Sequence, residues 1–233
     1  ETYEYARFFN AQQPIDFVFG DVIHIPNTPS IVKSRPISED NQNSVLLKLD
    51  KTRHFIRVLD DKPFLDKKDL MIGRGGIYQQ HRFDFYDKWF GHPLCDLGSV
   101  EKNGLSKPEW LTEKMNLKAH LDYKFILSLQ GNDVASNLKW IMSSNSIAVM
   151  PKPTIETWFM ESKLEGGKHY IEIAPDYHDL EAKLTYYIAH PEECLKILDN
   201  AHQYVAQFWN KEAEDLCSLM VLQKYFSQVT SNK

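Results

Sequence analysis

The sequence contains few cysteines, and it lacks long apolar runs and basic tracts. Its three cysteines, Cys95, Cys194 and Cys217, are too widely spaced for a disulfide framework or a zinc site. We therefore expect free, partly buried thiols in a reducing compartment. No apolar run approaches the roughly 20 residues that cross a bilayer, and no secretory signal is visible, although the chain begins with Glu1 rather than methionine. The 27 basic and 32 acidic residues are well mixed, which argues against nucleic acid as a partner.

Motifs of several common enzyme classes are also missing. The nine histidines are scattered singly, without the spacing of a zinc protease. No Asp-x-Asp follows a predicted strand, so a divalent cation that holds a diphosphate is not indicated. The P-loop, the dinucleotide fingerprint and the nucleophile elbow are absent as well, which disfavours a nicotinamide-dependent oxidoreductase and a serine hydrolase. We expect neither a metal ion nor a bound cofactor.

The composition and the apolar pattern predict an α/β protein. The hydrophobic share of 42% suits a packed core, and 233 residues suit one large or two small domains. In the C-terminal half, strands alternate with helices in the rhythm of a parallel sheet. The predicted strands are 69–76, 123–129, 146–150 and 169–173, and the predicted helices are 135–144, 154–164 and 179–189.

The remaining segments predict a different N-terminal part and a helical C-terminus. After a helix end at 1–10, we expect a short buried strand at 15–22, a long Pro- and Ser-rich loop at 26–45, and strands at 45–50 and 54–60. Residues from Pro191 onwards show helical spacing almost throughout. We therefore divide the chain into residues 1–68, 69–190 and 191–233.

Two strand–turn–helix segments are candidate binding sites. In the first, Arg74 and Arg82 flank a Gly75-Gly76 turn, where backbone N–H groups and guanidinium groups could bind a diphosphate. In the second, the apolar run 125–127 leads to Gly131, and a helix is predicted soon after it. Small hydrogen-bonding residues follow this glycine, among them Asn132 and Ser136. An ordinary turn with surface arginines and a simple capped helix explain the two segments equally well.

Three carboxylates are further candidates. Glu156 and Glu161 lie on the predicted helix 154–164, where one of them could accept hydrogen bonds from ribose, or both could be solvated. Of the two, we favour Glu156, in the first helical turn. Asp21 ends the predicted strand 15–22, and it could act as a general base or serve only as a turn residue.

An ordered set of segments resembles glycosyltransferase family 90. The segments are "RGG…HR", "YKFILSLQGNDVASNLKWIMSSNSIAVM", "ETWFMESKL", "HYIEI" and "DLEAKL". The resemblance covers roughly residues 15–210 and is strongest from 69 to 185. It implies a GT-B fold of two Rossmann-like lobes, and it leaves open whether the N-terminal lobe is complete here. It also implies an inverting, metal-independent transfer from a UDP-sugar.

The resemblance assigns roles to the candidate residues. Arg74 and Arg82 match the family's arginines, and Arg82 matches the ligand of the donor diphosphate. Residues 131–139 match the segment that cradles the nucleotide, but Asn137 stands where Rumi-type members carry an arginine. Either Lys139 supplies that charge, or diphosphate binding depends more on Arg82 and backbone amides. Asp21 is the best match for the general base.

The segment "MPKPTIETWFMES" is similar to sequences of the bacterial lipopolysaccharide branch of the family. This favours a hydroxyl of a lipid-linked oligosaccharide core as acceptor, with a protein acceptor as the alternative. We expect a cytoplasmic protein, at most peripherally associated with an inner membrane. A sugar-nucleotide-binding module without catalytic activity is the competing interpretation.

Overall fold

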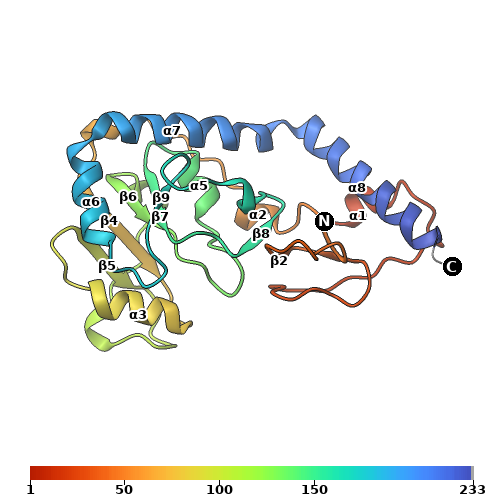
Figure 1. Ribbon diagram of the computed structural model, residues 1–233, viewed down its shortest axis with the longest axis horizontal. Helices are drawn as coiled ribbons and strands as arrows, with labels where there is room; N and C mark the ends of the chain where they lie inside the picture. The colour runs from red at the N-terminus through yellow and green to blue at the C-terminus, as the bar shows by residue number, and fades with distance from the viewer. Residues whose placement is uncertain (232–233) are drawn as a thin grey trace.

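The central element is a five-stranded parallel sheet in the order β5-β4-β6-β7-β9 (Figure 1). The computed structural model describes residues 1–231. The strands are β4 (Lys68–Gly75), β5 (Cys95–Ser99), β6 (Tyr123–Leu127), β7 (Ile147–Met150) and β9 (Ile171–Glu172). All five residues of β6 and all four of β7 are buried, as expected for strands covered on both faces. The predicted parallel sheet is confirmed.

Helices cover both faces of this sheet because alternate strand residues point to opposite sides. Met71 and Phe125 pack with Phe85 of α3 (Gln80–Trp89) in one apolar cluster. Their chain neighbours Ile72 and Ile126 belong to the other cluster, which includes Leu138 to Met142 of α5 (Leu138–Met142). Further helices are α4 (Leu117–His120) and α6 (Leu180–Ala189), with short 3-10 turns at Phe64–Asp66 and Pro108–Trp110.

The N-terminal residues form short strands rather than a second large sheet. β1 (Ser30–Val32) pairs in parallel with β3 (Ser44–Leu46), and β2 (Ser34–Pro36) pairs with β8 (Ile155–Thr157). The loop predicted at 26–45 therefore contains two strands. Within residues 1–231 there is one five-stranded sheet and two two-stranded ones. The second Rossmann-like lobe of a GT-B fold thus stays a prediction.

Three predicted elements are wrong. Residues 15–22 form only an isolated bridge, between Phe17 and Ile31, and 54–60 form no strand, because α2 (Lys51–His54) is followed by irregular chain. The predicted helix 154–164 is instead β8 followed by a 3-10 turn at Glu161–Lys163. Pro151 and Pro153 hold the chain extended before this segment. Antiparallel pairing with β2 then satisfies its backbone, a tertiary contact that helical spacing cannot reveal.

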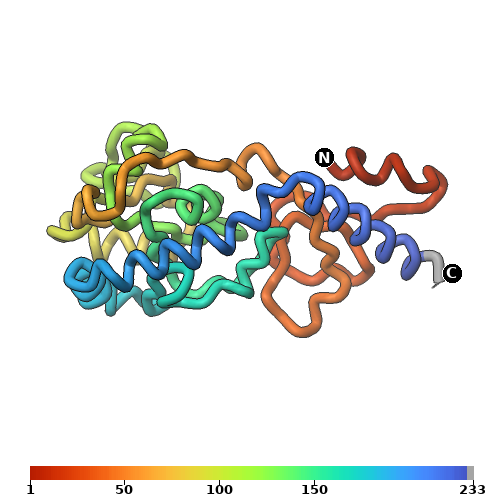
Figure 2. The backbone as a smooth tube through the Cα atoms, turned by 90° about the horizontal axis from the view of Figure 1, so that it is seen from above, coloured from red at the N-terminus to blue at the C-terminus, as the bar shows by residue number. Residues whose placement is uncertain are grey.

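Two C-terminal helices join the N-terminal residues to the parallel sheet. α7 (Pro191–Ala206) lies along the sheet, and after the 3-10 turn Gln207–Trp209, α8 (Lys211–Ser231) continues towards α1 (Tyr3–Ala6), as Figures 1 and 2 show. The Tyr5 hydroxyl donates to Asp215 at 2.9 Å, and the Asp16 amide donates to the Tyr225 hydroxyl at 2.9 Å. The predicted helical C-terminus is confirmed, and it fixes residues of the N-terminal part against the rest.

A buried ion pair links α5 to the segment after β8. The Lys139 ammonium lies 2.7 Å from Oε1 of Glu161, and the two side chains are 0% and 1% exposed. Glu161 also accepts hydrogen bonds from the amide and the hydroxyl of Thr157. The hydrogen bonds from Thr157 to the Glu161 carboxylate hold residues 157–161 in a tight turn.

We expect Lys139→Met to destabilise the fold strongly. The substitution leaves the Glu161 charge buried without its cation, which costs about 3–5 kcal/mol. The double variant Lys139→Met, Glu161→Gln removes that charge and recovers much of the loss. Urea unfolding measures both effects, with Lys168→Met, which breaks an exposed pair with Glu165, as the control. A single variant as stable as the control would contradict the role of the pair.

Candidate functional site

A cavity of about 370 Å³ lies at the carboxyl ends of β4 and β6. Ligands of open α/β sheets bind at this edge. The turn after β4, the start of α3 and the turn after β6 form most of the wall, and Asp21 and Arg53 complete it from the N-terminal part. Predicted site residues in this wall are Asp21, Arg74, Gly75, Arg82, Gly131, Asn132 and Ser136. The structure thus brings together seven residues that are up to 115 positions apart in the sequence.

Arg82 holds the two turns together. Its guanidinium donates to the carbonyl oxygens of Gly76 at 2.9 Å, Leu129 at 2.7 Å and Gln130 at 2.9 Å. Within the described part of the chain, no carboxylate forms an ion pair with it, and burial lowers the pKa of Arg82. A partly buried cation bonded only to neutral carbonyls stabilises an anion placed beside it. Arg82 is therefore the main source of positive potential in the cavity.

Arg74 is arranged differently, because its charge is already paired. Its Nη2 lies 2.5 Å from Oδ1 of Asp96, and its Nη1 donates to the Asp96 carbonyl at 2.7 Å. The Tyr123 hydroxyl donates to the other Asp96 oxygen at 2.5 Å. The Arg74 Nε is buried and has no hydrogen-bond partner. Arg74 thus adds one free donor but less net charge than Arg82.

The turn after β6 is shaped by Asn137 and Gly131. Asn137 accepts a hydrogen bond from Ser128 and donates to the Leu127 carbonyl at 2.9 Å, so it ties the end of β6 to α5. Gly131 has no positive φ, and a Cβ there would meet only ordinary contacts, the nearest at 3.5 Å. The fold itself therefore does not require glycine at 131. Because α5 begins at Leu138 and has only five residues, its dipole contributes less than the helix predicted from residue 135.

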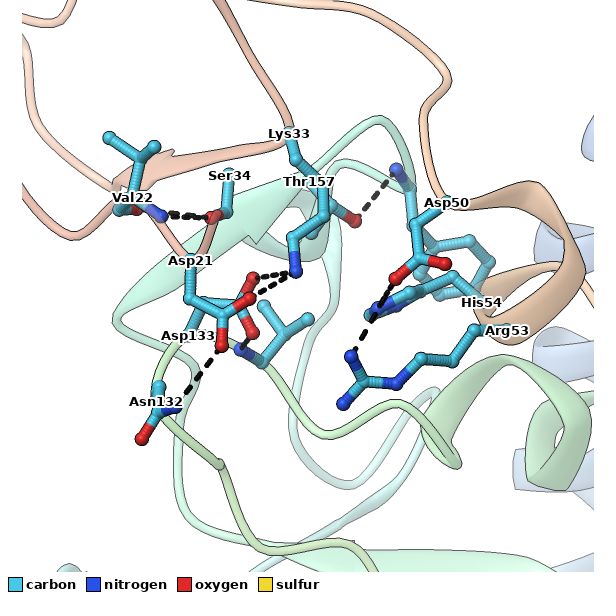
Figure 3. A network of polar contacts seen from close by, with 12 residues as sticks. Asp21, Val22, Lys33, Ser34, Asp50, Arg53, His54, Asn132, Asp133 and Thr157 are labelled. Carbon is cyan, nitrogen blue, oxygen red and sulfur yellow. Dashed lines mark hydrogen bonds and ion pairs between the residues drawn. The ribbon is translucent and has the colours of Figure 1, made fainter. Parts of the chain in front are cut away.

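Asp21 lies in the cavity wall, in a bend rather than at the end of a strand. The Lys33 ammonium is 2.5 Å from its Oδ1, and the Asn132 amide donates to its Oδ2 at 3.2 Å. The hydrogen bond from Lys33 is the main reason that the pKa of Asp21 is lowered. Lys33 also contacts Asp133 at 2.9 Å (Figure 3). The carboxylate is thus ionised and held against the cavity.

Three predicted residues do not reach this cavity. Lys139 is fully buried in its pair with Glu161, so it cannot supply the charge that an arginine at 137 would bring. Glu156, on β8 instead of a helix, pairs with Arg35 at 2.8 Å and accepts from Ser162. Glu161 lies in the wall of a second cavity of about 280 Å³. This second cavity shares Leu129, Val134 and Ala135 with the first.

Lys33 and Arg53 were not predicted as parts of the site, whereas Asp133 lies in the predicted turn after Gly131. Lys33 falls in the predicted loop, and Arg53 falls between the predicted strands 45–50 and 54–60, where α2 forms. Neither residue lies in a recognisable motif, because only tertiary folding brings these two side chains to Asp21. Asp133 follows Gly131-Asn132 directly, and its place in the same turn was the one available signal.

The parallel sheet and the arginine-lined cavity at its carboxyl edge define an α/β protein with a candidate site for an anionic ligand. Residues 96–232 match the family described as Glycosyl transferase family 90. The chain is also 46% identical over 221 residues to the O-glucosyltransferase LpsA of Dichelobacter nodosus, and the match covers 95% of this chain and 69% of that protein. This chain belongs to glycosyl transferase family 90, as its ordered motifs predicted. Across the described residues, no helix is long and apolar enough to cross a membrane.

A buried histidine lies next to the site. The His54 ring is 2% exposed, 3.4 Å from the Lys139 ammonium and 3.5 Å from Asp50. Burial, and secondarily the charge of Lys139, lower the pKa of His54 from 6.5 to about 3. His54 is therefore neutral in the folded protein, whereas it gains a proton near pH 6.5 when the chain unfolds.

We expect acid to destabilise the protein through His54. Because the folded pKa is depressed, this contribution is complete above pH 6.5 and is lost as pH falls towards 3, by up to about 1.4 kcal/mol per pH unit. His54→Asn should therefore flatten the dependence of unfolding free energy on pH between 6.5 and 5. Urea unfolding at several pH values measures this, with exposed His178→Asn as the control. An unchanged slope would show that His54 is not the group that titrates.

Proposed function

We propose that this chain is an inverting, metal-independent glycosyltransferase that uses a UDP-sugar. It would move a hexose or pentose to a hydroxyl of a lipopolysaccharide or lipooligosaccharide core. The observation that supports this most directly is that Arg82, without a carboxylate partner, and the ionised Asp21 face one cavity. Membership in the family supports glycosyl transfer itself, and the relative's name favours glucose as the sugar.

The first cavity suits the donor diphosphate. Arg82 provides the charge, Arg74 provides a free Nε, and Gly131 leaves room for close approach of the ligand to the backbone. Gly75, Asn132 and Ser136 would complete the contacts. As the bond to UDP breaks, negative charge grows on the leaving phosphate oxygen, and a preorganised guanidinium stabilises it. In this proposal Arg82 takes the part that a divalent cation plays in other transferases.

The second cavity suits the nucleoside. It adjoins the first, and its wall is largely apolar, with Leu138, Met150 and several prolines. Polar residues in the same wall include Ser128, Lys152 and Thr154, whose hydroxyl donates to Gln130 at 3.1 Å. Of the two candidate glutamates, Glu161 is the one placed in this wall, so we propose it, rather than Glu156, as the ribose contact. Its side chain is 1% exposed and its oxygens already accept bonds from Thr157 and Lys139, so a small shift of this wall would have to open it to a ribose hydroxyl.

Asp21 is proposed as the general base. The acceptor oxygen attacks the anomeric carbon, the new carbon–oxygen bond forms as the bond to UDP breaks, and Asp21 takes the hydroxyl proton. UDP departs with the bonding electron pair. General-base assistance of this kind contributes about 10²–10⁴ in rate. Residues 1–68, with Asp21, would then form the acceptor side and residues 69–190 the donor side of a GT-B cleft, with helices 191–233 joining them.

The acceptor is proposed from resemblance to the bacterial lipopolysaccharide branch. Such an acceptor places the protein in the cytoplasm, at most peripherally on an inner membrane. Two alternatives remain as candidates: transfer to a protein hydroxyl by the same chemistry, and a non-catalytic module that only binds a sugar nucleotide. Release of UDP from UDP-glucose by the purified chain would exclude the second of these.

UDP should bind without a divalent cation. Because the guanidinium of Arg82 faces the diphosphate, calorimetric affinity for UDP should be the same in Mg²⁺ and in EDTA. Loss of binding in EDTA would contradict the metal-independent site.

Substitutions of Asp21 and Arg82 should separate catalysis from donor binding. Asp21→Asn keeps the shape but removes the basicity, so kcat for UDP release from UDP-glucose should fall about 10²-fold or more with little change in UDP affinity. Arg82→Ala should weaken UDP binding as well as turnover, since the diphosphate is charged in both ground and transition states. Arg82→Lys keeps the charge but loses the hydrogen bonds that the guanidinium donates to three carbonyl oxygens.

The matched control is Asp87→Asn, because Asp87 is an exposed carboxylate on α3 that pairs with Lys107. It should retain full activity. Near-normal turnover by the Asp21→Asn protein would remove Asp21 from the mechanism.

A further inference from the structure

Lys33 lies between two carboxylates that come from distant parts of the chain. It is the single residue between β1 and β2, and its side chain is 12% exposed. Its ammonium contacts Asp21 at 2.5 Å and Asp133, in the turn after β6, at 2.9 Å (Figure 3). Lys33 is not in the wall of the 370 Å³ cavity, whereas both of its carboxylate partners are.

We propose that Lys33 is a positioning residue, which fixes the Asp21 carboxylate to the donor-side turn and keeps it ionised for transfer. The inference rests on the proposed role of Asp21 as the base. It also links the two sides of the site, because Lys33 belongs to the N-terminal strands and Asp133 belongs to the turn that would hold the diphosphate.

The geometry supports positioning because Asp21 has little regular structure of its own. Gly20 precedes it with a φ of +86°, and the next residue, Val22, exchanges hydrogen bonds of 3.0 and 3.1 Å with the Ser34 hydroxyl. The backbone beside Asp21 is thus anchored next to Lys33. With Lys33 on one oxygen and Asn132 on the other, the carboxylate cannot rotate freely. Each oxygen keeps lone-pair capacity for an acceptor hydroxyl.

The charges around Asp21 determine what happens when Lys33 is removed. The charged groups that face Asp21 are Lys33, Asp133 behind it, and Arg53 from α2, while Asn132 contributes a neutral donor. His54 lies nearby but is neutral. Without Lys33, Asp21 and Asp133 lose their shared cation and repel each other, which raises the pKa of Asp21. A general base works only when deprotonated, so activity should then be lost at a higher pH than in the natural chain.

The test is the pH dependence of kcat/KM for UDP release from UDP-glucose, between about pH 5 and 8, where a base of altered pKa changes the rate. In Lys33→Met, the ratio of activity at pH 5 to activity at pH 8 should fall about 10-fold relative to the natural chain. Lys33→Arg keeps the cation and should restore the natural ratio. Asp133→Asn removes the repelling anion, so Lys33 then pairs with Asp21 alone. The activity of this variant should persist to the same pH as in the natural chain or to a lower one.

Several results would overturn the inference. If kcat/KM of Lys33→Met falls by the same factor at every pH and the unfolding midpoint is lower, Lys33 has a merely structural role. An acid-side loss in Asp133→Asn would have the wrong sign, and it would overturn the inference even if Lys33→Met does not fold. The proposed function fails separately: an active Asp21→Asn protein removes the base itself. An inactive Asp21→Asn protein with an unshifted Lys33→Met profile removes only the role of Lys33.

Discussion

The site depends on one partly buried cation, Arg82, which forms no ion pair with a carboxylate of the described residues. The Arg82 guanidinium donates hydrogen bonds to three backbone carbonyls of two separate turns. These bonds hold the turns after β4 and β6 together around a cavity. A carboxylate partner would hold the turns equally well but would cancel the charge. Arg74, a few residues earlier, shows that alternative, because Asp96 neutralises it. The contrast makes Arg82 the residue that an incoming phosphate would meet.

Ion pairs with little exposure to solvent stiffen the surroundings of the cavity. Lys139 and Glu161 connect α5 to the segment after β8, and Arg35 of β2 pairs with Glu156 of β8. The helices α7 and α8 bring further contacts along both parts of the molecule. Since buried pairs are costly to break singly, this frame resists the displacement of Asp21 from the edge of the sheet. Preorganisation of that kind favours charge stabilisation without movement.

The sequence was most informative where apolar periodicity and glycine turns dominate. The parallel strands, the two turns at the cavity and the seven residues that share its wall were predictable, because each turn follows a buried run. The strand β8 was not predictable, and a helix was wrongly predicted at 154–164, because β8 forms by pairing with residues 34–36, far away in the chain. For the same reason Lys33 and Arg53 carry no local signal, and Lys139 was a candidate to supply charge to the diphosphate although it is fully buried. Tertiary pairing decides these positions.

The proposed roles of Arg82 and Asp21 depend on where a nucleotide binds. A crystal structure of the chain with UDP tests this most directly. We predict the diphosphate beside the Arg82 guanidinium, within about 3 Å of a phosphate oxygen, the uracil and ribose in the adjoining cavity by Leu138 and Glu161, and Asp21 facing the end of the diphosphate. UDP bound elsewhere, or with Arg82 and Asp21 both remote from the diphosphate, would contradict it.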